Sequence, residues 1–180
     1  MIKTPEQPFY KWISLPFALA FLAFLFPLLT FSCSEQVIAE PNAYELALGV
    51  DLKNHLAEKE LEMIEKMSIE NPKAFEKNPL KLDAMPVLFC IFASIFVAGI
   101  FAYITPLGSA VLGVASLPGL WFFIYRFTAL VEKGQFGFIA VTPNIGAYCV
   151  SILLIIGIAL SLAFTIRPLL RKNKTSINFY

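Results

Sequence analysis

The chain has 180 residues, of which 58% are hydrophobic, and its mean hydropathy is +0.71. Soluble domains contain about 45–50% apolar residues, so this composition excludes an ordinary soluble domain. The net charge is only +1, which leaves no basic footprint for a nucleic acid. We therefore expect a membrane protein that binds no nucleic acid.

The chain contains four long apolar runs, and each approaches or exceeds the about 20 residues that a helix needs to cross a bilayer. No Asp, Glu or Lys interrupts them, and inside lipid their backbone groups are satisfied only within helices. The sequence predicts an all-α membrane protein with four transmembrane helices and one extracytoplasmic amphipathic helix. The predicted membrane helices cover residues 13–32, 85–104, 107–131 and 146–166.

The first run has an alternative interpretation as a secretion signal that ends at Cys33. Its apolar region is longer than the usual about 7–15 residues, and Pro16 and Pro27 lie inside it. A lipoprotein signal would need a small residue before the cysteine, which Ser32 supplies, and usually a Leu three residues before it, where Thr30 stands. We expect a retained anchor, with lipidation of Cys33 as the alternative.

The long segment after this run, residues 33–84, contains one predicted helix outside the membrane. Asp51 is a typical helix-starting residue, and the helix is predicted over residues 51–69, before Asn71 and Pro72. One side of this helix is apolar at helical spacing, and we expect that stripe to dock on a protein partner or on the membrane bundle. The stripe consists of Leu52, Leu56, Met63 and Met67.

The sole histidine, His55, lies on the same predicted helix. Imidazole and thioether groups bind copper(I), so His55 with Met63 and Met67 is a candidate metal set. However, His55 and Met63 are roughly 80° apart around the helix axis and two turns apart along it. Methionines at helical spacing more often pack than ligate. We predict no metal site and no cofactor.

The third predicted membrane helix, residues 107–131, contains Pro118 and Gly119 in its middle. This pair predicts a helix break, which is a candidate lining for a transport pathway. A very short turn over residues 105–108 joins this helix to the second one, so we expect an antiparallel hairpin. An outer loop over residues 132–145 follows.

The distribution of lysine and arginine predicts the orientation. The tail, residues 167–180, is basic and contains no acidic residue, whereas the segment 33–84 contains six lysines and eleven acidic residues. We expect the arm of residues 1–12 and the tail in the cytoplasm of a bacterial cell, and the long segment outside the inner membrane. The basic residues of the tail are Arg167, Arg171, Lys172 and Lys174.

The three cysteines, Cys33, Cys90 and Cys149, all fall near the outer leaflet in this topology. An oxidising compartment would permit a disulfide there, and Cys33 with Cys149 is the favoured pair because Cys90 lies deeper. The alternative is that each thiol is a small buried hydrophobic group.

Arg126 is the one charged residue inside a predicted span. Charged residues inside membranes are functional candidates. Arg126 lies near the outer end of its helix, where its side chain reaches lipid headgroups or forms an ion pair with Asp83 or Glu132. The alternative to this passive position is a functional one, in which Arg126 binds a lipid headgroup or a partner protein.

Small residues four apart in the predicted spans indicate close packing between helices, or oligomerisation. They are Ala98 and Ala102, Ala115 and Gly119, and Gly157 and Ser161. No sequence motif of a hydrolase, kinase, P-loop protein or dinucleotide-binding enzyme is present. We therefore predict that the protein is not an enzyme.

The segment from Pro27 to Cys33, with Ser32 before the cysteine, and the segment from Tyr44 to Gly49 resemble a pattern in uncharacterised small bacterial inner-membrane proteins. In that pattern Ser-Cys follows the first membrane helix, and a Leu-x-x-Gly segment comes next. The resemblance implies a bacterial envelope protein in which Ser32 and Cys33 form a structural or site-forming corner.

These features predict a non-enzymatic multi-pass membrane protein, an accessory or scaffolding subunit of a bacterial envelope complex. Its expected partners are membrane lipids and other proteins of that complex. The alternative function is a small transporter or channel component with a pathway at Pro118 and Gly119.

Overall fold

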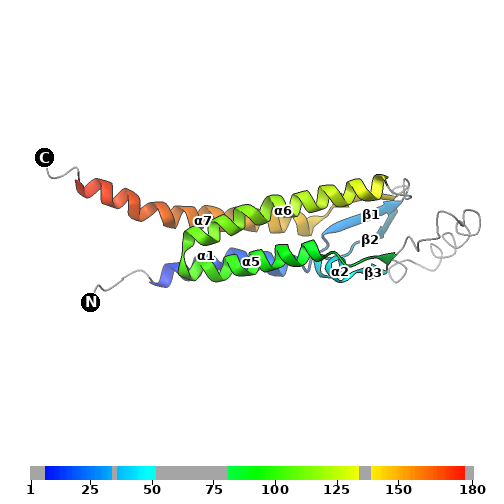
Figure 1. Cartoon of the computed structure of the whole chain (residues 1–180), viewed down its shortest axis with the longest axis horizontal. Helices are drawn as coiled ribbons and strands as arrows, with labels where there is room; N and C mark the ends of the chain where they lie inside the picture. The colour runs from blue at the N-terminus through cyan, green and yellow to red at the C-terminus, as the bar shows by residue number, and fades with distance from the viewer. Residues whose placement is uncertain (1–6, 34–35, 52–80, 134–138, 177–180) are drawn as a thin grey trace, which may run out of the picture. The chain divides into compact units, whose positions relative to one another are not determined.

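The computed structural model describes residues 7–33, 36–51, 81–133 and 139–176 (Figure 1). The described chain is mostly helical, but it also contains short strands, so the all-α prediction is only partly right. Contacts divide the chain into two compact units. Unit 1 comprises residues 1–23, 90–119 and 149–180, and unit 2 comprises residues 24–89 and 120–148.

Three of the described helices are long and apolar enough to cross a membrane. They are α5 (Pro86–Ile104), α6 (Pro106–Lys133) and α7 (Ile145–Ser176), and their apolar stretches are Pro86–Ile104, Pro106–Val131 and Ile145–Ile166. The predictions over residues 85–104, 107–131 and 146–166 are therefore confirmed as apolar helices of spanning length. α7 continues to Ser176, so the first part of the predicted basic tail is helical.

The predicted first membrane helix, over residues 13–32, is wrong in its second half. α1 (Gln7–Ala23) has 17 residues and ends well before Cys33, and the chain then forms strand β1 (Leu29–Cys33). A helix of this length rises about 25 Å, which is less than the about 30 Å of the hydrocarbon core. Pro27 has no N–H group for a helical hydrogen bond and disfavours helical backbone at the residue before it, which opposes a longer α1.

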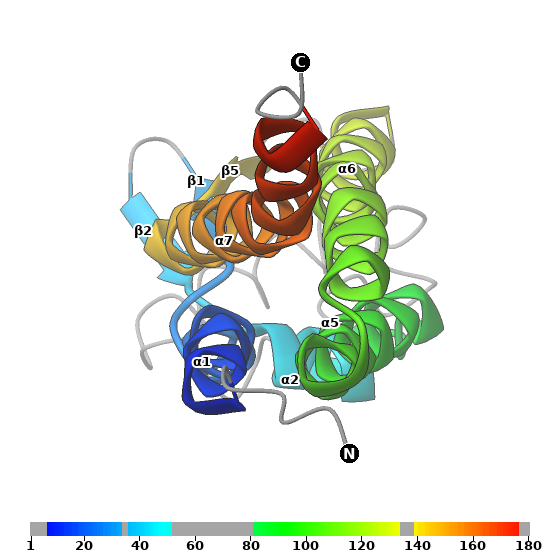
Figure 2. The ribbon, with the colours of Figure 1, turned by 90° about the vertical axis from the view of Figure 1, so that its left-hand side faces the viewer.

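Figure 2 shows the helices of unit 1 end-on, and the contacts between them show that neighbouring helices run antiparallel. Ser14 in the first half of α1 contacts Tyr103 near the end of α5. Phe21 near the end of α1 contacts Phe92 in the first half of α5, so the two helices run in opposite directions. The rings of Phe21 and Phe92 lie 6.4 Å apart, edge to face. α6 and α7 are joined in the same antiparallel sense by Ser109 and Ser161, whose hydroxyl oxygens lie 2.8 Å apart.

Phe17 of α1 fills the centre of unit 1, with only 1% of its surface exposed. Its ring reaches α6 and α7 because both helices have a glycine at the contact. A methyl group built on Gly157 would lie 2.9 Å from Phe17 Cζ, and one built on Gly113 would lie 3.2 Å from Cε1. Real Cβ atoms essentially never show the first distance and seldom show the second, so the two glycines create the space that the ring occupies.

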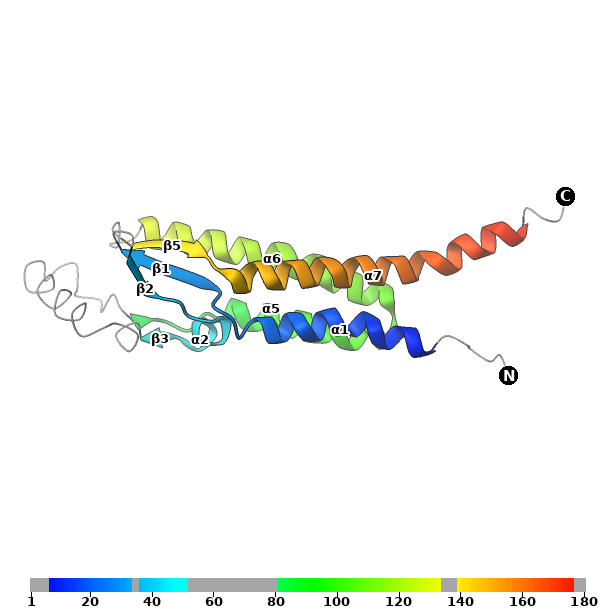
Figure 3. The ribbon, with the colours of Figure 1, turned by 180° about the vertical axis from the view of Figure 1, so that it is seen from behind.

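Unit 2 contains a three-stranded antiparallel sheet in the order β2–β1–β5 (Figure 3). The strands are β1 (Leu29–Cys33), β2 (Gln36–Ala39) and β5 (Ile139–Pro143), and the register of β1 with β5 places Phe31 opposite Val141. Phe31 is buried and packs edge to face on Phe127 of α6, with ring centroids 6.0 Å apart. β5 falls in the predicted outer loop over residues 132–145, which is therefore partly strand.

The short helix α2 (Ala43–Leu48) follows β2 and carries a capping box. The Asn42 side chain accepts a hydrogen bond from the Glu45 N–H, and the Glu45 carboxylate accepts one from the Asn42 N–H. Gly49 ends α2 with φ 92°, a conformation that side chains rarely adopt. Burial raises the pKa of the Tyr44 phenol above its ordinary value.

After Gly49 the chain forms strand β3 (Val50–Asp51), which pairs with β4 (Lys81–Leu82). Asp51, the predicted first residue of the helix, is therefore the last residue of a strand. The rest of the predicted helix over residues 51–69 lies outside the described residues.

We expect Phe17→Ala to reduce the free energy of unfolding by about 3 kcal/mol or more, because it removes a fully buried ring and leaves a cavity. Unfolding of the purified protein with sodium dodecyl sulfate in mixed micelles measures this. Leu19→Ala, which truncates an exposed side chain of the same helix, is the matched control. Equal losses in the two variants would contradict a central role for Phe17.

Candidate functional site

The predicted cysteine pair lies on two different elements. Cys33 is the last residue of β1, where Ser32 beside it donates a hydrogen bond to the Ala140 carbonyl. Cys149 lies in the first turns of α7, Cys90 of α5 is exposed, and these two described cysteines are not bonded to one another. Because the side chain of Cys33 lies outside the described part of the structure, the Cys33–Cys149 disulfide stays a prediction.

The predicted docking stripe, Leu52, Leu56, Met63 and Met67, lies wholly outside the described residues. His55, the candidate copper ligand, lies there as well. Within the ranges that the structure describes, no group of three or more His, Cys, Asp or Glu residues could hold a metal ion. The stripe and its partner stay predictions.

Arg126 lies on α6 with its side chain exposed. Asp83, one of its two predicted ion-pair partners, is also exposed, and no ion pair joins the two residues. The side chain of Glu132, the other predicted partner, lies outside the described residues. Contact of Arg126 with lipid headgroups therefore stays a prediction.

The predicted helix break at Pro118 and Gly119 is wrong as a break, because α6 runs continuously through both residues. Proline removes one backbone donor from the helix and leaves the Val114 carbonyl without its usual partner. In an apolar surrounding, all other arrangements would leave more backbone groups unsatisfied, which favours the uninterrupted helix.

A cluster of three polar side chains, Thr30, Glu40 and Asn144, holds unit 2 together. The Asn144 amide donates hydrogen bonds to Thr30 Oγ1 at 2.8 Å and to Glu40 Oε1 at 2.9 Å. Thr30 Oγ1 also lies 3.3 Å from the same Glu40 oxygen, to which it donates. The cluster thus connects β1, the residue that follows β2, and the residue that follows β5.

Backbone hydrogen bonds reinforce this connection at the turn between α1 and β1. The Asn144 N–H donates to the Leu28 carbonyl at 2.9 Å, and the Gly146 N–H donates to the Pro27 carbonyl at 2.9 Å. On the other side, the Leu28 N–H donates to the Pro41 carbonyl at 3.0 Å. Both edges of the turn are therefore satisfied by segments that are distant in sequence.

Asn144 also starts α7. Its side-chain oxygen accepts a hydrogen bond from the Ile145 N–H, and its carbonyl accepts the first helical bond, from Ala147. Asparagine directly before an apolar run is a common N-cap signal, so the sequence carried a hint of this role. The geometry of the polar cluster fits a structural tie between strands.

No protein-family model, no curated protein and no solved structure matches this chain.

We expect Asn144→Ala to reduce the free energy of unfolding by about 1–3 kcal/mol, because it removes two amide hydrogen bonds and leaves their acceptors without that donor. Thermal unfolding followed by circular dichroism measures the loss. Thr142→Ala, at an exposed position two residues earlier in β5, is the control and should change stability much less. The structural role fails if Asn144→Ala unfolds like the control.

Proposed function

We propose that the protein is a non-enzymatic multi-pass protein of the bacterial inner membrane that acts as an accessory or scaffolding subunit of an envelope complex. The three apolar helices support a place in the membrane. In the most apolar stretch of each helix only 28–39% of the residues are buried within the structure. Most of their apolar side chains are therefore left for lipid or for partner helices.

The observation that carries the proposal is the character of the described core of unit 1. It is filled by Phe17 and other apolar side chains, and its buried polar side chains are serines. Ser116 donates to the Leu112 carbonyl, one turn earlier in its own helix. Ser109 and Ser161 each lie within hydrogen-bond distance of a carbonyl of their own helix as well as of one another.

Such a core favours a structural role over transport. Proton and ion carriers place Asp, Glu, His or Lys inside the membrane, where these groups accept the cargo. Serine hydroxyls that bond to their own helix stabilise close helix packing instead. A scaffolding subunit needs this packing and a large apolar outer surface, and unit 1 offers both.

The orientation in this proposal places both termini in the cytoplasm. Within unit 1, the start of α1 and the late part of α7 lie at the same end as the turn between α5 and α6, as the pairs Ser14 with Tyr103 and Ser109 with Ser161 indicate. The basic residues after the apolar part of α7 support a cytoplasmic location for that end.

Purification from native membranes in mild detergent, with mass spectrometry of the intact assembly, tests the proposal. We expect a stoichiometric complex with at least one other protein. A lone monomer or a homo-oligomer would contradict the role as a subunit and would favour the transporter alternative.

The same preparation tests the predicted docking stripe. We expect Leu56→Glu or Met63→Glu to release the partner, because a charge on the stripe opposes burial against another protein. Leu61→Glu is the matched control, since the helical pattern places Leu61 away from the stripe. Retention of every partner by the stripe variants would exclude docking by this segment.

A further inference from the structure

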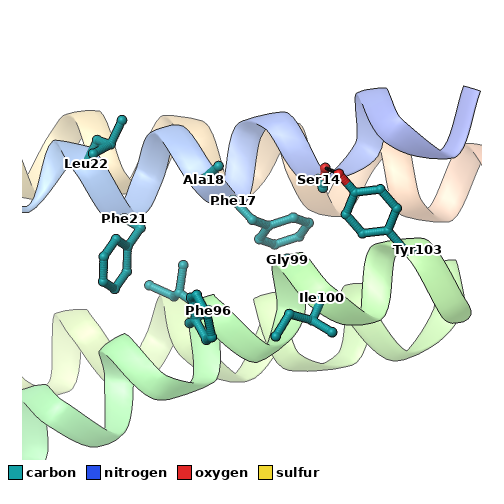
Figure 4. Close-up of a pocket in the computed structure, with 10 residues that line it drawn as sticks. Ser14, Phe17, Ala18, Phe21, Leu22, Phe96, Gly99, Ile100 and Tyr103 are labelled. Atoms are coloured by element: carbon teal, nitrogen blue, oxygen red, sulfur yellow. Dashed lines mark hydrogen bonds between the residues drawn. The ribbon is translucent and has the colours of Figure 1, made fainter.

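A groove with a volume of about 390 Å³ runs between α1 and α5 in unit 1 (Figure 4). Phe17 and Gly99 form part of its lining, and a Cβ built on Gly99 would be in ordinary contact with Phe17 Cβ. Leu22, Phe96 and Ile100 border the groove with 46–57% of their surfaces exposed. The groove is therefore open to the surroundings of the helices and is not an enclosed cavity.

Both helices contribute a small residue to the lining of the groove, Ala18 from α1 and Gly99 from α5. A methyl group on Gly99 would lie 3.6 Å from Phe17 Cβ, which is ordinary contact, so there is room for a methyl group at this point of the lining. Ala18 supplies the small side chain on α1. From Ser14 to Leu22 the groove follows α1 for about 12 Å at 1.5 Å per residue.

Polar groups gather at one end of this groove. Ser14 Oγ donates a hydrogen bond to the Tyr103 hydroxyl at a distance of 3.1 Å. A tyrosine hydroxyl both accepts and donates, so Tyr103 keeps its own proton for a further acceptor. More than half of the Tyr103 surface is exposed, which leaves the hydroxyl accessible.

This polar end coincides with the end of the apolar part of each helix. Tyr103 is followed by Ile104, the last residue of α5, and Ser14 follows closely on Trp12, where the apolar part of α1 begins. The Trp12 side chain is 64% exposed. Exposed Trp and Tyr residues at helix ends are typical of the headgroup level of a membrane, and the groove extends from that level along the apolar helix surface.

We propose that this groove binds one acyl chain of a membrane phospholipid, whose ester carbonyl accepts a hydrogen bond from the Tyr103 hydroxyl. The elongated apolar lining matches a single hydrocarbon chain, and the hydroxyl pair lies at the depth where glycerol esters lie. Among the described residues that line the groove none is charged, and the hydroxyl of Tyr103 beside an apolar surface matches an ester group and its chain. The inference rests on the proposed place of the protein in a membrane.

Photocrosslinking of the full-length protein in phospholipid nanodiscs tests the proposal. The probe is a phosphatidylethanolamine with a diazirine in the distal half of one acyl chain, and mass spectrometry maps its adducts. We expect adducts to concentrate on Phe21, Leu22 and Phe96, to saturate at one lipid per chain, and to be competed by unlabelled phosphatidylethanolamine.

Two variants fill the groove from opposite sides. Gly99→Leu and Ala18→Leu should each lower the adduct yield at these residues by about tenfold, because the added side chain occupies the space of the acyl chain. Ala93→Leu, an exposed change on α5 outside the groove, is the matched control and should leave the yield unchanged. If one filling variant fails to fold, as judged by thermal unfolding, the other carries the test.

The hydroxyl is tested separately. Tyr103→Phe retains the ring and removes the donor, and we expect it to weaken competition by the unlabelled lipid about fivefold, as for the loss of one hydrogen bond. Unchanged competition would overturn the role of Tyr103.

Other outcomes would overturn the site as a whole. Adducts spread evenly over exposed α7 residues such as Ile152 and Ile155, and insensitive to Gly99→Leu and Ala18→Leu, would indicate bulk lipid only. Crosslinks from the groove to a second copy or to a partner protein would show that the groove is a protein interface. Release of the chain from membranes by carbonate would instead overturn the proposed membrane location, a failure distinct from the loss of lipid binding alone.

Discussion

The packing of one aromatic ring, Phe17, determines how the helices of unit 1 fit together. The ring needs the space that Gly113 and Gly157 leave, so it fixes the approach of α6 and α7 to α1 at the same point. In lipid no hydrophobic force drives helices together, and association depends on contacts of this kind. α1 is too short for a conventional span, and this contact gives it a defined place among the longer helices.

The same ring helps to create the groove beside it. Phe17 lies over Gly99 with a separation that leaves room for a methyl group, whereas it touches α6 and α7 more tightly. α1 is therefore packed closely on one side and loosely on the other. A loosely packed, open side at a helix pair is where a lipid chain adds the contacts that the protein lacks.

The sequence was sufficient to predict α5, α6 and α7, because long uncharged apolar runs allow little except helices. It was insufficient for residues 24–33, which are equally apolar but form a turn and strand β1. Strand β1 forms because it pairs with β5, at residues 139–143. Such long-range pairing leaves no periodic signal in either segment. The polar cluster was missed for the same reason, since Asn144 lies 114 residues from Thr30 and 104 from Glu40.

Two hydroxyl pairs in unit 1 show how burial decides what a polar group does. Ser109 and Ser161 are fully buried, and each lies near the other and near a carbonyl of its own helix, so their hydrogen-bonding capacity is used within the bundle. Ser14 and Tyr103 have the same chemistry at an exposed position, where the Tyr103 proton is left for an outside acceptor. At the headgroup level an ester carbonyl of a lipid is an acceptor that suits this donor. The buried pair is therefore a structural contact, and the exposed pair is the one suited to recognition.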